Sequence, residues 1–320
     1  MPRKLAEKFD NGLQDILYSK RDLDRLNVIH VAGTKGKGST CAFTRSFLEA
    51  RGKKTGYPGK VGLYTSPHLR VIRERIQINS QLIQKDLFAK YVYEVWNKLE
   101  AKEDLPKPRY LQLLLMVAIH TFIREKVDVA VCETHHGGEY DATNVFPHPV
   151  ATGITPIGMD HMAQLGPSIE NISWHKSGIF KPGAPAFSSA QEDKVAEVLR
   201  SRAMEKNVSL DFVNGETVSN SDLVALKPAV QRQNASLALK LANAFLLQKD
   251  RNRTTLTSNE IREGVEAFTW IGRFQQIIQE NYTWFLDGAH NEMSVPYAAQ
   301  WFADVTKESR YEVYSHGWTA

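Results

Sequence analysis

The stretch that decides the fold is HVAGTKGKGST, residues 30–40. It lies between an apolar run at 26–32, which predicts a strand, and residues 39–50, which predict a helix with Phe43 and Phe47 facing inward. Glycines let backbone N–H groups approach phosphate oxygens, lysines add positive charge, and a Ser or Thr hydroxyl can ligate magnesium. The stretch therefore predicts a loop that binds a polyphosphate.

The spacing of this loop is a variant of the standard phosphate-loop pattern, which has four residues between its first Gly and its Gly-Lys-Ser/Thr. Here only two residues separate Gly33 from Gly36, and Gly38 precedes Ser39. A flexible surface loop is the competing interpretation, and it explains the glycines but not the flanking strand and helix. We therefore expect nucleotide binding.

The composition is that of an ordinary globular protein. The chain has 320 residues, 42% hydrophobic and 24% charged, with a net charge of +4, which suggests about two domains. Basic residues are scattered, so nucleic acid is not favoured as a partner, and the mild charge suits a small anionic substrate. Cys41 and Cys132 lie in apolar runs and are expected to be buried free thiols in a reducing compartment. We expect a cytoplasmic enzyme without a membrane span or an N-terminal signal.

Strand-like and helix-like runs alternate along the chain, which predicts an α/β fold with a mainly parallel sheet flanked by helices. Residues 127–133 are nearly all apolar and end in Glu133, as in a buried parallel strand. Because ligands bind at the carboxyl ends of such strands, Glu133 is expected beside the phosphate loop. Further strands are expected at 150–155, after 182, at 284–287 and at 311–315, and further helices at 111–124, 168–177, 191–206, 233–247 and 293–305. Residues 214–228 are polar and are expected to form a linker or loop.

Several separated motifs follow one another in order, from HVAGTKGKGSTCAF at 30–43 to LDGAHN at 286–291. Together they resemble the folylpolyglutamate synthases, ATP-dependent amide ligases related to the Mur ligases of peptidoglycan synthesis. The intervening motifs are GLYTSPHL, RERIQIN, GGEYDATN, ITPIGMDHMAQLG, HKSGIFKPG, QRQNASLAL and GRFQ.

The resemblance implies a reaction in which the γ-carboxylate of a folate attacks ATP and forms an acyl phosphate, from which the amine of glutamate displaces phosphate. ATP and Mg²⁺ are the implied cofactors, because the metal offsets phosphate charge. Ser66, Glu133 and His161 match the magnesium ligands of the family together with Ser39, and the histidine would complete a second metal site. The nucleotide-binding residues implied in the loop are Gly33, Thr34, Lys35, Gly36, Lys37, Gly38, Ser39 and Thr40.

Other matched residues lie further along the chain. Lys176 matches a lysine that is carbamylated in related enzymes, where it becomes an anionic oxygen ligand; with Lys37 and His161 it makes up the implied catalytic set. Asn234 matches a position near the adenine. The residues that reach the nucleotide from the interdomain linker and the second domain are matched by Arg273, Asp287 and His290.

Each of these residues has a plainer interpretation. Glu133 could form a structural salt bridge, although an unpaired carboxylate at the end of a buried strand is costly. His161 alone would be an ordinary histidine and Lys176 an ordinary surface lysine, and only the longer motifs favour a role. The pair His135 and His136 suggests a transition-metal site, but adjacent side chains on an extended backbone point in opposite directions, so metal binding there is not favoured.

The chain departs from the family pattern in four places. Only residues 288–320 follow Asp287, where the family has a full Rossmann-like domain, so we expect an ATP-binding domain at 1–270 and a truncated remnant at 271–320. The small apolar stretch that the family has after the strand glutamate is replaced by Thr134, His135 and His136. A more apolar acceptor site is suggested by Leu111, Gln112 and Leu114. Before the helix at 233–247, residues 228–231 lack a histidine that the family has. The alternative function is therefore a repurposed enzyme acting on another, more apolar acid, with or without ATP, or a non-catalytic binding protein. A homodimer could replace the missing domain.

Overall fold

The phosphate loop joins β1 (Ile29–Ala32) to α3 (Lys37–Thr55) in the middle of an eight-stranded sheet. The computed structural model describes residues 17–102, 107–214, 226, 228–280, 282–289 and 294–307. The strand order is β4–β3–β2–β5–β1–β6–β7–β8. The strands of this sheet, besides β1, are β2 (Val61–Tyr64), β3 (Ile76–Ile78), β4 (Gln81–Leu82), β5 (Val129–Glu133), β6 (Ala151–Ile154), β7 (Ala186–Ser189) and β8 (Leu210–Val213).

From β2 to β8 every neighbouring pair in this order is parallel, and only β3 and β4 run antiparallel at one edge. The predicted α/β class with a mainly parallel sheet is therefore confirmed. Parallel strands need crossover connections, and the helices supply them. Besides α3, the helices in these connections are α4 (Lys85–Glu100), α5 (Tyr110–Arg124), α6 (Met162–Leu165), α7 (Ile169–Lys176) and α8 (Asp193–Glu205). Helix α2 (Lys20–Asp24) precedes β1, whereas α10 (Ala229–Lys249) and α11 (Ser258–Glu266) follow β8.

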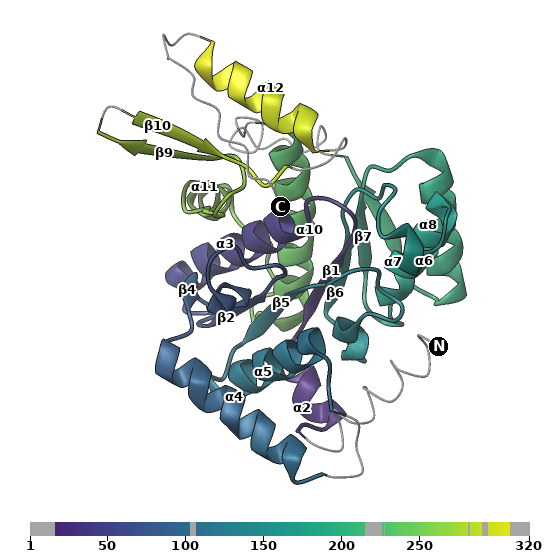
Figure 1. Ribbon diagram of the computed structural model, residues 1–320. Coiled ribbons are helices and arrows are strands. Elements are labelled where there is room, and N and C mark those ends of the chain that lie inside the picture. Colours follow the sequence, from purple (N-terminus) through teal and green to yellow (C-terminus); the bar gives the residue numbers. More distant parts are fainter. Residues whose placement is uncertain are drawn as a thin grey trace.

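Helices cover both faces of the sheet (Figure 1). Along β5 the side chains alternate: Val129 and Val131 pack in a core with α3 and α10, while Ala130 and Cys132 pack in another with α4 and α5. This alternation is the period of two that a strand imposes. A strand buried on both faces has no polar side, which explains the continuous apolar run in the sequence.

Helix α7 begins at the residue that the sequence indicates. The Ser168 side chain accepts a hydrogen bond from the backbone N–H of Asn171 at 3.2 Å. We expect Ser168→Ala to lower the free energy of unfolding by about 1 kcal/mol, because one N–H at the helix start loses its partner. Urea denaturation measures this change, and Ser168→Asp, which restores an acceptor, should recover most of it; equal losses in both variants would contradict the capping role.

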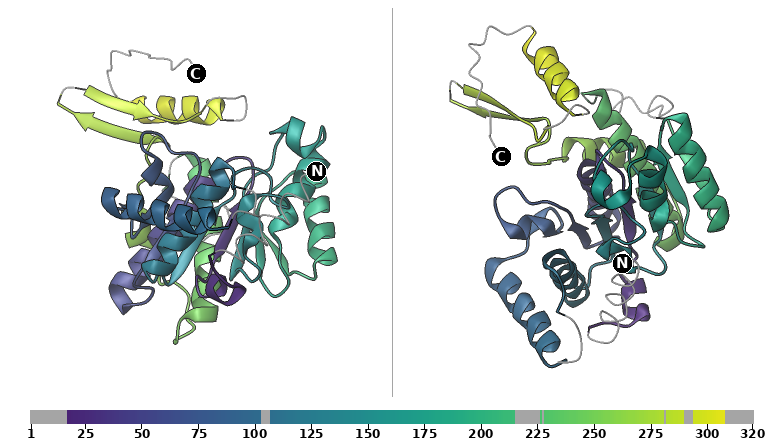
Figure 2. Two further views of the ribbon diagram at one scale, coloured as in Figure 1. Left: turned by 60° about the horizontal axis from the view of Figure 1, so that its bottom comes forward. Right: turned by 45° about the vertical axis from the view of Figure 1, so that its right-hand side comes forward.

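The last described segment forms a separate layer over one end of the sheet (Figure 2). Strands β9 (Gln275–Gln279) and β10 (Tyr282–Leu286) form an antiparallel pair, and α12 (Val295–Thr306) packs on one face through Trp301, which contacts Phe285. Only one of these two strands is predicted from the sequence: β9 has three glutamines, which hide its strand pattern. The expected strand at 311–315 lies outside the described residues, and so does most of the expected loop at 214–228.

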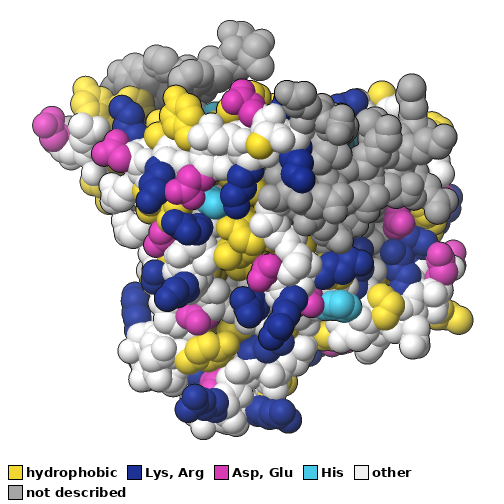
Figure 3. Space-filling view, turned by 90° about the horizontal axis from the view of Figure 1, so that it is seen from below, with side chains coloured by type: hydrophobic (Ala, Val, Ile, Leu, Met, Phe, Trp, Pro, Cys, Tyr) yellow, Lys and Arg dark blue, Asp and Glu magenta, His cyan; other side chains and the backbone are white. Residues whose placement is uncertain are grey.

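No helix among the described ranges is long and apolar enough to cross a membrane. On the face shown in Figure 3, Lys and Arg side chains are spread among Asp and Glu rather than gathered in one patch. Cys41 and Cys132 are both buried and unpaired, as predicted.

Candidate functional site

The backbone of the phosphate loop packs closely against neighbouring side chains at Gly33 and Gly36. A Cβ at Gly33 would overlap the Thr155 hydroxyl, and one at Gly36 would overlap the Asn234 side chain. Gly36 also has a left-handed backbone, with φ of 83°, at the start of α3. Glycine is therefore required at both positions by space as well as by conformation.

Two hydrogen bonds hold the outer side of the loop to the segment after β6. The Thr34 N–H donates to the Pro156 carbonyl at 3.0 Å, and the Thr34 hydroxyl donates to the Gly158 carbonyl at 3.1 Å. The loop is thus held by these bonds at Thr34 and by its continuation into α3. Residues 36–39 form the start of α3, where the N–H groups of the first turn have no partner within the helix.

Two lysines converge on the carbonyl of Gly33. Lys37 Nζ donates to it at 3.2 Å, and Lys176 Nζ, from the end of α7, donates to it at 2.7 Å. Only 1% of Lys176 is exposed. Burial, with the nearby positive charge of Lys37, lowers the pKa of Lys176 to about 7. A large share of this amine is consequently uncharged and nucleophilic near neutral pH.

Glu133 lies at the carboxyl end of β5, beside the start of α3. Its Oε2 accepts a hydrogen bond from the Ser66 N–H at 3.0 Å and would lie 3.4 Å from a Cβ at Gly38. Burial raises the pKa of Glu133, while Lys37 and the Ser66 N–H act in the opposite direction. The structural salt bridge, the plainer interpretation of this carboxylate, is not among the ion pairs of the described residues.

The oxygen donors at this edge suit magnesium. Glu133 is a buried carboxylate bonded to the N–H of Ser66 and close to Gly38, which precedes Ser39. Mg²⁺ prefers oxygen ligands and is held by one or two carboxylates plus substrate phosphates. Within the described ranges no group of three or more His, Cys, Asp and Glu side chains could hold a metal ion on its own. The residues therefore fit a metal that arrives with the nucleotide, rather than a resident one in a protein cage.

His161 lies on the other side of the loop, in a left-handed conformation with φ of 49°. Its Nε2 is 3.6 Å from Asp160 Oδ1, and its ring lies 5.3 Å from the ring of His136. The neighbouring His135 turns the opposite way, into the core beside Asp141. The two adjacent histidines thus point apart, as their spacing predicts.

Asn234, from α10, lies behind the loop. It is buried, its Oδ1 lies 3.5 Å from the Thr40 hydroxyl, and its Nδ2 donates to Gln231 Oε1 at 2.9 Å. In this arrangement it supports the loop, and its role near the adenine stays a prediction. Gln231 lies in the first turn of α10, within the stretch 228–231 that is expected to lack the histidine of the family pattern.

Arg273 and Asp287 lie in the segment that approaches the loop from the C-terminal layer. The charge of Arg273 acts on Glu133 and so lies within reach of the site. Asp287 accepts hydrogen bonds from the Phe274 and Ala289 N–H groups, both at 2.8 Å, and thereby ties the two ends of the hairpin together. The roles of both at the nucleotide stay predictions, and His290 lies outside the described residues.

Three features of the site are not found from sequence alone. Arg75 donates to the Ser66 hydroxyl at 2.8 Å, the Trp270 ring would lie 3.3 Å from a Cβ at Gly38, and Tyr64 donates to His135. Arg75 belongs to the RERIQIN motif, and this motif could have indicated a role for it at the site. The other two contacts join segments distant in the sequence, so no local pattern indicates them.

Two residues at the start of α5 that differ from the expected family pattern, Gln112 and Leu114, stabilise the helix. Gln112 accepts a hydrogen bond from the Arg109 N–H at 2.8 Å, and Leu114 is buried in the core. The more apolar acceptor site stays a prediction.

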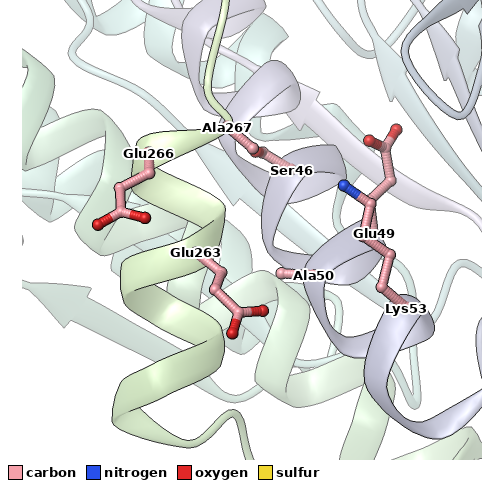
Figure 4. A pocket seen from close by; sticks show the side chains of 7 residues that line it. All are labelled: Ser46, Glu49, Ala50, Lys53, Glu263, Glu266 and Ala267. Carbon is pink, nitrogen blue, oxygen red and sulfur yellow. The ribbon is translucent and has the colours of Figure 1, made fainter.

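A hollow of about 350 Å³ lies between α3 and α11 (Figure 4). Glu49 and Lys53 line it from α3, and Glu263 and Glu266 line it from α11. Its carboxylates repel an anion, and it does not include the phosphate loop, so it is not the nucleotide site.

The sequence is similar to folylpolyglutamate synthases. It is 43% identical over 302 residues to that of Neurospora crassa, covering 91% of this chain and 57% of that protein. It is 42% identical over 306 residues to a probable folylpolyglutamate synthase of Schizosaccharomyces pombe, covering 94% and 60%. For the mitochondrial folylpolyglutamate synthase of Homo sapiens the identity is 40% over 307 residues, covering 88% and 51%. The chain thus spans between 51% and 60% of the length of these curated relatives. No protein-family model matches it.

Solved structures show the same relationship. A mutant of the L. casei folylpolyglutamate synthase superposes with a TM-score of 0.79 at 26% identity, covering 92% of this chain and 76% of that one. The Mycobacterium tuberculosis folylpolyglutamate synthase complexed with ADP and AMPPCP gives a TM-score of 0.78 at 27% identity, covering 92% and 70%. Sequence and fold are thus similar to those of folylpolyglutamate synthases over about nine-tenths of this chain.

Proposed function

We propose that this protein is an ATP- and Mg²⁺-dependent ligase that joins glutamate to the γ-carboxylate of a folate through an acyl phosphate. One observation carries the proposal: Lys37, Ser39, Ser66 and Glu133 meet at one edge of the sheet, where the first turn of α3 presents free N–H groups. The relatives named folylpolyglutamate synthase, and a neighbour described as a complex with AMPPCP and folate, supply the substrate classes. The two buried free thiols support a reducing, cytoplasmic setting.

In this proposal each residue has a task set by its place. The N–H groups of residues 36–39 and Lys37 hold the phosphates, and Ser39, Ser66 and Glu133 hold the metal. Mg²⁺, when bound, would offset the charge that develops as the phosphoryl group moves to the acceptor carboxylate. Lys176, in its neutral form, can react with CO₂ to give a carbamate and a proton, which would place an anionic oxygen beside His161.

Nucleotide binding is tested by thermal and urea unfolding with and without ATP and Mg²⁺. A ligand at 100 times its dissociation constant adds about 2.7 kcal/mol to the free energy of unfolding. We expect this gain in the wild type and expect Lys37→Ala to lose most of it, because a charged phosphate contact contributes about 1.5–3 kcal/mol. The control is Lys240→Ala, which removes a half-exposed lysine paired with Asp211 on the surface. A wild type without any gain at millimolar Mg²⁺ would overturn the proposal.

A further inference from the structure

Five buried polar side chains, which the proposed function does not use, lie in a row joined by three hydrogen bonds and one ion-pair contact. Tyr64 Oη lies 2.7 Å from His135 Nε2, and His135 Nδ1 lies 3.5 Å from Asp141 Oδ1. Asp141 Oδ1 also lies 2.7 Å from the Thr143 hydroxyl, which lies 2.8 Å from His30 Nε2. All five side chains are almost completely removed from solvent.

The direction of every hydrogen bond in this row follows from the carboxylate. Asp141 also accepts from the N–H groups of His136 and Thr143, both at 2.9 Å. Burial raises the pKa of Asp141, but the neighbouring His135, the Thr143 hydroxyl and these N–H groups outweigh it and hold the pKa below the usual range. An ionised carboxylate only accepts, so the Thr143 hydroxyl donates to it and accepts from His30. His135 Nδ1 faces the carboxylate at 3.5 Å, which favours a proton on Nδ1 and leaves Nε2 to accept from the Tyr64 hydroxyl.

This row connects the strand ends that carry the magnesium residues. Tyr64 ends β2 two residues before Ser66, and His135 follows Glu133 by two residues. The parallel register between β2 and β5 stops at Tyr64 and Cys132, so Ser66 and Glu133 lie beyond it. Past that point the strand ends are joined by two hydrogen bonds, from the Ser66 N–H to Glu133 and from Tyr64 to His135.

We propose that Tyr64 and His135 are positioning residues that fix the separation of Ser66 and Glu133 for Mg²⁺. The proposal rests on the proposed function. A phenol bonded to an imidazole holds the two strand ends at one distance before the metal arrives.

The test is a magnesium titration of AMPPCP binding, measured by calorimetry on the full chain, alongside AMPPCP binding without metal. We expect Tyr64→Phe to raise the Mg²⁺ concentration for half-maximal binding about tenfold, the size of effect seen when a residue that supports a metal ligand is removed. Metal-free binding should stay unchanged. His135→Gln, which can still accept from Tyr64, should have a smaller effect than His135→Asn, and Tyr64→Phe combined with His135→Asn should be less than additive.

A second tyrosine–histidine–carboxylate set gives a matched control. Tyr18 Oη lies 2.8 Å from His120 Nδ1, and His120 Nε2 lies 2.7 Å from Glu94, between α4 and α5. Tyr18→Phe should lower the melting temperature and leave the magnesium midpoint unchanged.

Equal magnesium midpoints for Tyr64→Phe and Tyr18→Phe would overturn the positioning role while leaving the proposed function intact. A wild type that binds no AMPPCP at any magnesium concentration would overturn both. If Tyr64→Phe does not fold, the two His135 variants decide the question, because a merely structural histidine would show no difference between them in the magnesium midpoint.

Discussion

Replacing Glu133 with glutamine is expected to reduce magnesium-dependent turnover by about two to three orders of magnitude and at the same time to stabilise the metal-free protein. Turnover falls because an anionic metal ligand becomes a neutral amide beside the phosphates. Stability rises because a buried carboxylate without a cation partner is costly, whereas glutamine keeps an acceptor for the Ser66 N–H. We expect a gain of about 1 kcal/mol in the free energy of unfolding.

The pH dependence of this gain follows from the raised pKa of Glu133. Above that pKa the folded wild type holds a buried charge, so the penalty is complete at neutral pH. As the pH falls through the folded pKa and then through the ordinary value of 4.5, both states become protonated and the advantage of glutamine disappears. Urea denaturation at pH 7 and pH 4 measures the difference.

Glu260→Gln is the matched control for this variant. Glu260 is equally buried but pairs with Arg51, with 3.3 Å between Nη1 and Oε2, away from the phosphate loop. Its replacement should destabilise the protein and leave the magnesium dependence of nucleotide binding unchanged. If Glu133→Gln also destabilised the metal-free protein, the carboxylate would have a structural partner and the metal role would be refuted.

Lys176→Met is expected to reduce turnover about a hundredfold and to change how stability depends on pH. The folded pKa is about 7, against 10.5 for an ordinary lysine. Between these values the unfolded chain binds more protons than the folded one, so the free energy of unfolding of the wild type rises with pH. The slope is at most about 1.4 kcal/mol per pH unit. Below about pH 7 both states are protonated and the full burial penalty applies.

In CO₂-free buffer, methionine should remove this rise between pH 7 and 10 and make the variant more stable than the wild type at pH 6. Carbamylation is checked separately, by ¹³C NMR after addition of labelled bicarbonate, with a carbamate signal in the wild type and none in Lys176→Met. Lys176→Glu, which keeps an anionic oxygen, should retain more activity than methionine. Full activity in CO₂-free buffer, or in Lys176→Met, would refute the carbamate.

Much of the fold can be predicted from local patterns. The phosphate loop, α3 and β5 follow from apolar runs and glycine spacing, and Phe43 and Phe47 are buried as expected. The sequence analysis assigns no helix to α4, because only Tyr91, Val95 and Leu99 form its buried stripe. The division of the chain at residue 270 stays a prediction, and so does the homodimer, which light scattering at high concentration can test.

The site is predicted less completely than the fold. Glu133 could be placed beside the loop because parallel strands share one carboxyl edge. The bond between Tyr64 and His135 joins residues 71 positions apart, and it depends on the register of β2 against β5, which no local pattern contains. The motif that contains Asn234 predicts a position near the nucleotide. It does not predict the contact of Asn234 with Thr40 behind the phosphate loop, because that contact also joins segments distant in the sequence.

The side chains of Thr155 and Asn234, which fill the space behind Gly33 and Gly36, bear on the thermodynamics of nucleotide capture. A loop supported from behind and anchored through Thr34 has few conformations to lose when a ligand binds. Less of the interaction free energy is then consumed in ordering the backbone, which is the advantage of a preorganised site. The Thr34 and Lys35 amides, which already donate to the Pro156 carbonyl, should accordingly have the same hydrogen-exchange protection before and after nucleotide binding.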